Sequence, residues 1–252
     1  MLRSLKILSS MSFISYSTNG PVAQLTLNRP DKLNAVHPDM VRDLQTAFDQ
    51  AEADPDIRVI LLNGAGRAFS AGFDNNATEQ CGNETMDEAI RREIVDIYEL
   101  ILRIWDCPKP TIAAVHGYCL GSSLELCAVC DMTISSKDCR FGEPEVTFGS
   151  GIVFLILPWI LGFKHTNEIL LLGRKDIDAN RAFDIGLVNR VVDDDKLMDE
   201  ALSVANELAA NDAYAVAGTR RAIRRTLDHA GFRDAISEAL EIDVGIEITN
   251  QE

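Results

Sequence analysis

The chain has 252 residues, of which 46% are hydrophobic and 25% are charged, and its formal net charge at pH 7 is −15. This length and composition exclude a disordered chain and are enough for one domain with a substantial core and an appendage. The negative charge excludes a protein that binds nucleic acid through a basic surface, because phosphates would be repelled.

Apolar alternation, helical periodicity and turn residues predict the order of the elements along the chain. Up to residue 192 strands and helices alternate, which is compatible with a layered or spiral α/β arrangement; periodicity alone does not choose between this and a doubly wound sheet. In chain order we expect a hairpin of strands 12–17 and 22–27, a helix at 37–53, a strand at 57–62, a loop at 70–85, a helix at 86–104, a strand at 111–115, a helix at 122–130 and a strand at 132–135.

Beyond Val191 the pattern changes to consecutive helices with no strand between them. The one basic cluster, Arg220–Arg225, lies in this part, and we interpret it as a solvated helix face or a subunit contact. The predicted helices are 196–210, 213–229 and 232–248, and the predicted regions are an N-terminal extension at 1–11, an α/β core at 12–192 and a helical C-terminal region at 193–252.

Six cysteines occur in this long, core-rich chain, so we expect free buried thiols and no disulfide framework. Cys127 and Cys130 form a C-x-x-C pair, but a structural zinc site needs a second pair of ligands, and none lies nearby in the sequence. We therefore predict no metal site.

The first ten residues are basic, serine-rich and free of acids, a composition that weakly resembles an organelle transit peptide. We expect a bacterial cytoplasmic protein, with the mitochondrial matrix as the alternative if residues 1–10 are a targeting segment. The longest apolar run, Gly151–Phe163, contains Pro158 and is too short to span a bilayer, so we expect no membrane partner.

Two glycine-containing segments follow predicted strands, Phe69–Asp74 and His116–Glu125. The first, taken alone, is typical of a plain turn. In the second, the free N–H groups of the helix that starts after Gly121 would polarise a carbonyl oxygen, and Glu125 lies about one turn from them. A carboxylate in this apolar stretch is costly to bury unless it is paired or functional, and a raised pKa would suit a proton carrier. A structural cap or a buried ion pair is an equal alternative for this segment alone.

A second acidic segment, Phe141-Gly-Glu-Pro-Glu145, forms a constrained turn. Glu143 and Glu145 flank Pro144, and only one of them needs to face a pocket. Taken alone, a surface turn is the better interpretation. The sequence contains no GxGxxG or Walker pattern, and the serines after Gly121 lack a nucleophile-elbow pattern.

Together, and in this order, these segments resemble the crotonase (enoyl-CoA hydratase/isomerase) family, and most closely its two-glutamate enoyl-CoA hydratases. The resemblance runs from about residue 12 to residue 210. It is carried by Leu27–Ala35, Phe69–Asp74, Lys109–Gly121, Leu124–Asp131, Phe141–Glu145 and Ala182–Arg190.

The resemblance implies an α/β, crotonase-like spiral of ββα units with a C-terminal helical trimerisation region, assembled as a homotrimer or a dimer of trimers. It implies no cofactor, because a coenzyme A thioester is the substrate. The thioester oxygen would lie between the backbone N–H groups of Phe73 and Ser122, and Glu125 and Glu145 would be catalytic. Residues matched to coenzyme A or substrate binding are Lys32, Leu33, Ala35, Ser70, Ala71, Gly72, Asp74, Tyr118, Gly121 and Gly149.

The function that this resemblance implies is reversible addition of water to a 2-enoyl-CoA thioester. The alternatives are a Δ3,Δ2-enoyl-CoA isomerase or an acyl-CoA hydrolase on the same fold, and a non-catalytic binding protein of crotonase fold. The loop Phe148–Val153 is shorter than the family's glycine-rich loop and precedes the bulky segment Phe154–Trp159, which predicts an unusual acyl pocket.

Overall fold

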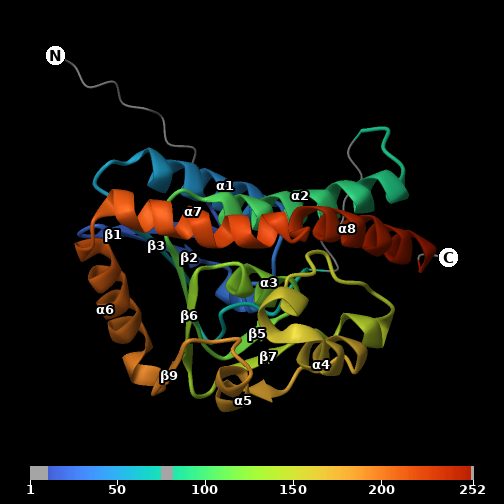
Figure 1. Ribbon diagram of the computed structural model, residues 1–252. Coiled ribbons are helices and arrows are strands. Elements are labelled where there is room, and N and C mark those ends of the chain that lie inside the picture. The colour runs from blue at the N-terminus through green and yellow to red at the C-terminus, as the bar shows by residue number, and fades with distance from the viewer. Residues whose placement is uncertain (1–10, 75–81, 251–252) are drawn as a thin grey trace.

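The computed structural model describes residues 11–74 and 82–250 (Figure 1). The predicted targeting segment at 1–10, and with it most of the predicted extension at 1–11, lies outside the described residues. Part of the predicted loop at 70–85 and Cys81 also lie outside them. The other five cysteines are buried and free, as the sequence predicted.

The main sheet has six strands in the order β1-β2-β3-β4-β6-β9. Its first pair is an antiparallel hairpin, and each later pair is parallel. The central strands are buried on both faces, which explains their nearly continuous apolar sequences. The strands are β1 (Ile14–Asn19), β2 (Val22–Leu27), β3 (Val59–Gly64), β4 (Thr111–Val115), β6 (Met132–Ser136) and β9 (Arg190–Val192).

A second, three-stranded sheet was not predicted, because its strands are too short to show a period. Its order is β5 (Tyr118–Leu120), β7 (Arg140–Gly142) and β8 (Ile177–Asp178). Strands of the main sheet alternate along the chain with those of this sheet: β4 leads into β5 and the helix α3 (Ser122–Ala128), and β6 leads into β7. The predicted α/β fold of repeated ββα units is therefore confirmed.

Helices cover both faces of the main sheet. The face that carries Leu25 and Leu62 packs on α1 (Pro38–Ala53), α2 (Met86–Asp106) and α3, whereas the face that carries Leu61 packs on α6 (Leu197–Ala210). Figure 1 shows α6 and α3 on opposite sides of the sheet. Because α6 completes this second core, the C-terminal region is part of the fold itself. The predicted boundary at residue 192 stays a prediction.

The remaining helices are α4 (Leu157–Leu171), α5 (Ala179–Asp184), α7 (Ala213–His229) and α8 (Phe232–Thr249). Helix α4 is kinked at Gly162, which has non-helical backbone angles. Helix α8 packs along α2 through Leu240 and Val244, which contact Ile90 and Ile94. Within the described part of the chain, no helix is both long enough and apolar enough to cross a membrane.

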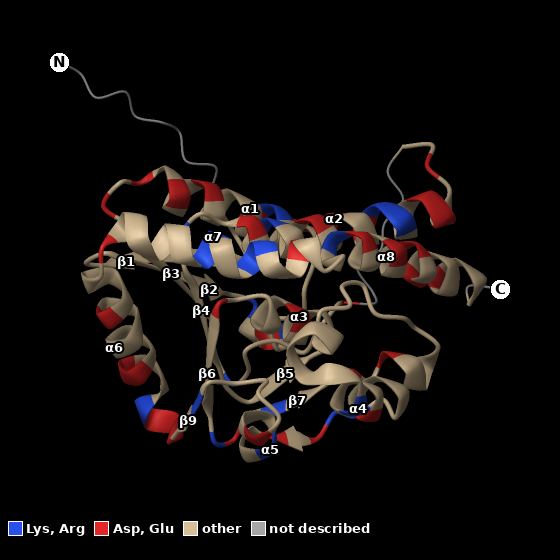
Figure 2. Ribbon diagram, in the orientation of Figure 1, with Lys and Arg blue, Asp and Glu red and all other residues tan. Residues whose placement is uncertain are grey.

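The basic cluster on α7 differs from its prediction, because two of its arginines are tied into the protein. Figure 2 marks these basic positions in blue on α7. Arg220 and Arg224 each contact the carboxylate of Asp131 at 2.7 Å, and the Arg224 guanidinium lies 3.8 Å from the centre of the Trp105 ring. Burial raises the pKa of Asp131, but the charges of the two arginines and their hydrogen bonds outweigh it and hold that pKa below its ordinary value.

We expect Asp131→Asn to lower the free energy of unfolding by about 3 kcal/mol, because it leaves two largely buried arginines without their counter-charge. Since the folded-state pKa of Asp131 is lowered, its contribution is present above pH 4 and is lost as the pH falls through that pKa. Urea unfolding at pH 7 measures the change. The exposed Asp56→Asn is the matched control, and equal stability of both variants would contradict the assignment.

Candidate active site

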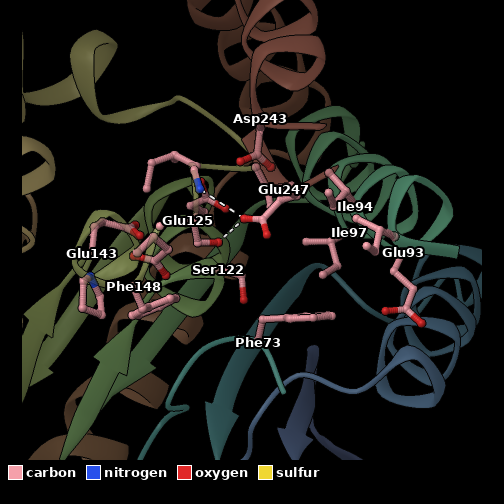
Figure 3. Close-up of a pocket in the computed structure, with 18 of the residues that line it drawn as sticks. Phe73, Glu93, Ile94, Ile97, Ser122, Glu125, Glu143, Phe148, Asp243 and Glu247 are labelled. Carbon is pink, nitrogen blue, oxygen red and sulfur yellow. Dashed lines mark hydrogen bonds between the residues drawn. The ribbon is translucent and has the colours of Figure 1, made fainter. Parts of the chain in front are cut away.

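A cavity of about 440 Å³ lies between the loop after β3, the start of α3, the segment 143–153, and helices α2 and α8 (Figure 3). One side is apolar, with Ile90, Ile94 and Ile97 of α2. Among the described residues that line it there is no lysine, arginine or histidine. Its acidic lining residues are Glu93, Glu125, Glu143, Glu145, Asp243 and Glu247.

The floor of the cavity is built by two segments that run side by side. The Ser70 N–H donates to the Tyr118 carbonyl at 2.9 Å, and the Leu120 N–H donates to the Ser70 carbonyl at 3.2 Å. The two backbones then meet at glycines: a Cβ atom on Gly72, whose φ is +94°, would lie 2.8 Å from the Leu120 carbonyl oxygen. Gly121, at φ +55°, lies against Gly72 from the other side. Only glycine permits this approach.

The residues that follow these two glycines, Phe73 and Ser122, present unused backbone donors beside the cavity. Ser122 is the first residue of α3, so its N–H has no partner within the helix. The next amide after Phe73 is used, because the Asp74 N–H donates to the Val36 carbonyl at 3.0 Å. Among the described residues, no acceptor takes either the Phe73 or the Ser122 N–H. The pair can therefore bind a ligand oxygen.

Glu125 lies on α3 and is 2% exposed. Its Oε1 accepts a hydrogen bond from the Phe154 N–H at 2.8 Å, and its buried Oε2 has no partner among the described residues. Burial raises the pKa of Glu125 well above its ordinary value, and the charges of Glu145 and Asp243 add to this against the opposing Phe154 bond. No cation pairs with it in the described structure, so a buried ion pair does not explain this carboxyl group.

Glu145 begins the short 3₁₀ helix Glu145–Phe148 and lines the same cavity as Glu125. A Cβ atom added at Gly121 would overlap the Glu145 Oε1, so this carboxyl group lies directly on the glycine backbone. Burial raises the pKa of Glu145. The turn that contains both glutamates is thus part of the cavity wall and not the surface turn that the segment alone suggested.

Glu143 also lines the cavity, although the sequence required only one of the two glutamates around Pro144 to do so. It is 1% exposed, and burial, followed by the charges of Glu145 and Glu125, raises its pKa well above the ordinary value. The only sign of Glu143 in the sequence was its position two residues before Glu145. In a turn at proline, this spacing does not predict which way each side chain points.

Helix α8 contributes Asp243 and Glu247, which the sequence analysis did not single out. The Glu247 Oε1 accepts hydrogen bonds from the Ser150 hydroxyl and from the Gly151 N–H, the latter at 3.1 Å (Figure 3). Asp243 is 2% exposed, and neither of its carboxyl oxygens has a partner among the described residues. Burial, and then the charges of Glu247 and Glu145, raise its pKa to about 7. The only sign of these two residues in the sequence was their spacing of four, which places both acids on one face of a helix.

The residues expected to bind coenzyme A or substrate fall into two groups. The segment Lys32–Ala35 adjoins the loop after β3, because the Ala71 N–H donates to the Leu33 carbonyl at 3.0 Å, and Asp74 pairs with Arg29 at 2.6 Å. Ala71 and Gly149 line the cavity together with the predicted catalytic and oxyanion residues. The cavity lining does not include Lys32, Leu33, Ala35, Ser70, Gly72, Asp74, Tyr118 or Gly121.

We expect Gly121→Ala to lower the free energy of unfolding by about 2 kcal/mol, because its backbone angles (φ +55°, ψ −137°) strain any side chain and the added carbon meets Glu145. Gly218→Ala is the control. Nothing lies near a Cβ atom there, and alanine in a helix stabilises by up to about 1 kcal/mol. Urea unfolding of both variants is the measurement; similar shifts would contradict the close contact.

We expect Asp243 to make stability depend on pH. Its pKa is about 7 in the folded protein against 3.8 for the free group, so the folded state holds this proton more tightly. That stabilisation is complete below pH 4 and is lost as the pH rises through about 7. Unfolding free energies at pH 5 and pH 8 should therefore differ less in Asp243→Asn than in the unaltered protein. Equal differences would show that Asp243 does not titrate in this way.

Comparison with known proteins shows which family the chain resembles. The described residues hold no group of side chains that could bind a metal ion. The short-chain-enoyl-CoA hydratase of Clostridium acetobutylicum is 32% identical over 216 residues, 82% of this chain and 78% of that protein. The peroxisomal Δ(3,5)-Δ(2,4)-dienoyl-CoA isomerase of Arabidopsis thaliana is 30% identical over 231 residues, 86% of this chain and 82% of that protein.

Solved structures and the family model lead to the same assignment. A crystal structure of an enoyl-CoA hydratase/isomerase from Xanthobacter autotrophicus matches with a TM-score of 0.90 and 46% identity, over 94% of this chain and 88% of that chain. The model of the enoyl-CoA hydratase/isomerase family matches residues 17–244. The chain therefore belongs to the enoyl-CoA hydratase/isomerase (crotonase) family, as its motifs predicted.

Proposed function

We propose that the protein is an enoyl-CoA hydratase that adds water reversibly to a 2-enoyl-CoA thioester. One observation carries the proposal: two unused backbone donors, at Phe73 and Ser122, and two carboxyl groups, the buried Glu125 and the half-buried Glu145, line one cavity whose described residues include no cation. The family acts on acyl-CoA substrates, and hydratases are among its members that this chain resembles.

In this proposal the thioester carbonyl oxygen accepts hydrogen bonds from the Phe73 and Ser122 N–H groups. Addition at the β-carbon pushes electron density onto that oxygen, so the two donors stabilise an enolate-like transition state more than the substrate. The donors are backbone groups fixed by the contact between Gly72 and Gly121, and they need no rearrangement during the reaction.

Glu125 and Glu145 hold one water between them in this mechanism. Glu125 takes a proton from the water as its hydroxyl adds to the β-carbon, and Glu145 delivers its proton to the α-carbon. The pair needs one ionised and one protonated member near neutral pH. Burial raises the pKa of both groups, and the charge of Glu145 adds to the rise at Glu125. Glu143, whose pKa is also raised by burial, is a further acid in the same cavity.

In this proposal coenzyme A enters the site as part of the substrate, and the reaction needs no bound cofactor or metal. Lys32, Leu33, Ala35 and Asp74 would contact it outside the cavity. A homotrimer or a dimer of trimers, and a cytoplasmic location, stay predictions.

A second candidate is a double-bond isomerase. The acids beyond the glutamate pair, Glu143 and Asp243, favour it, because a shift of the double bond needs a group that removes a proton from one carbon and a group that returns it to another. The resemblance to a dienoyl-CoA isomerase points the same way. Mass spectrometry of the products separates the activities, since isomerisation adds no water and hydrolysis releases free coenzyme A.

We expect Glu145→Gln and Glu125→Gln each to lower kcat for hydration of a short 2-enoyl-CoA by roughly 10²–10⁴-fold, because an amide can neither accept nor deliver the proton. KM should change little. Loss of the absorbance of the conjugated thioester measures the rate. Glu238→Gln, on the exposed face of α8, is the matched control. Full activity of both active-site variants would rule the mechanism out, and failure to bind any acyl-CoA would favour a non-catalytic protein.

A further inference from the structure

The end of the cavity opposite the unused backbone donors carries a carboxyl group that the proposed reaction does not use. In Figure 3, Asp243 lies across the cavity from Phe73 and Ser122, on α8. It is 2% exposed, and both of its oxygens lack a partner among the described residues. A buried carboxyl group in this state costs free energy until a hydrogen-bond donor or a cation reaches it.

The surrounding residues hold this side chain in place and do not satisfy it. A Cβ atom at Gly151 would overlap the Asp243 Oδ1, so the glycine leaves room for the carboxylate. One turn further along α8, Glu247 binds Ser150 and Gly151, and the Asn250 amide donates to the Gly149 carbonyl. Helix and loop are thus joined on the C-terminal side of Asp243, and the Ser150 hydroxyl and the Gly151 and Phe154 N–H groups donate to other acceptors.

The charge of the cavity restricts what can approach Asp243. Six carboxylic acids and no cationic side chain are among the described lining residues. A purely alkyl acyl chain would cover Asp243 and leave it unsatisfied, and an acyl chain that ends in a carboxylate would add a like charge. A hydroxyl or ammonium group would supply the missing donor, and an ammonium group would also offset the excess negative charge.

We propose that Asp243 is a specificity-determining residue that accepts a hydrogen bond from a donor group, a hydroxyl or an ammonium, on the distal part of the acyl chain. The inference rests on the proposed function for its reaction, and it defines the substrates as 2-enoyl-CoA thioesters with such a group. Ile90, Ile94 and Ile97 line the apolar side of the cavity and would contact the carbons of the chain.

The test uses four 2-enoyl-CoA thioesters of equal chain length that end in a methyl, a hydroxyl, an amino or a carboxylate group. For the unaltered protein we expect kcat/KM for the hydroxyl or the amino substrate to exceed that for the methyl substrate at least about tenfold, the effect of one hydrogen bond to a charged group. The carboxylate substrate should be the poorest. The better of the two donor substrates identifies the group that Asp243 binds.

Asp243→Ala should bring the ratio of the donor to the methyl substrate close to one. Asp243→Asn keeps the size of the side chain and an acceptor oxygen but no charge, so it should retain part of the preference for hydroxyl and lose the preference for ammonium. Both kcat/KM values in the ratio are measured on the same preparation of a variant, so a partial loss of folded protein does not change the ratio. Glu238→Gln, exposed on the same helix, should keep the ratio of the unaltered protein.

Two results would overturn the inference: equal kcat/KM for the methyl and donor substrates in the unaltered protein, or an unchanged ratio in Asp243→Ala. In both cases hydration of the methyl substrate would leave the proposed function standing. If no substrate is hydrated, the proposed function fails instead. Calorimetry with the saturated thioesters then tests Asp243 by itself. The unaltered protein should bind the amino or hydroxyl compound more tightly than the methyl compound, and Asp243→Ala should lose this difference. Equal binding of these compounds by the unaltered protein would overturn the inference.

Discussion

The candidate site depends on one close contact between two stretches of backbone, the loop after β3 and the turn before α3. A side chain on Gly72 would overlap the Leu120 carbonyl oxygen, and one on Gly121 would overlap the Glu145 carboxyl group. The contact leaves the next two amides, of Phe73 and Ser122, without protein acceptors among the described residues. Gly121 also provides the surface on which the Glu145 carboxyl group lies. The packing of these two turns therefore places both the donors and one of the acids beside the cavity.

Buried acids in this protein behave in opposite ways according to their partners. Asp131 has two arginines beside it, and its pKa is lowered despite burial. Glu125, Glu143 and Asp243 have only other acids near them in the cavity, and their pKa values are raised. The ion pairs of Asp131 stabilise the folded protein around neutral pH. The cavity acids, which have no counter-charge, destabilise it there. Acids held without counter-ions are typical of functional sites, where such a cost is retained for chemistry.

The sequence predicted most of the longer elements, such as β4 at Thr111–Val115 and the helix Ala213–His229, but not the helix α4. It missed β5, β7 and β8, because strands of two or three residues have no measurable alternation. The glutamates were found through local motifs. Asp243 was not, because it reaches the cavity only after α8 packs on α2, a contact between segments some 150 residues apart that no local pattern encodes.

Helix α8 links two parts of the cavity, the end that carries Asp243 and the loop whose last residue, Phe154, binds Glu125. The loop after Glu145 is short. Its contacts with α8 include hydrogen bonds from the Ser150 hydroxyl and the Gly151 N–H to Glu247. The same loop leads to Phe154, whose N–H orients the Glu125 carboxyl group. Because one helix supplies Asp243 and also binds the loop that leads to Phe154, we expect a change in the acyl group that α8 accepts to alter the orientation of Glu125. In the proposed mechanism, a shift of α8 that admits a different acyl group would therefore also move the proposed base.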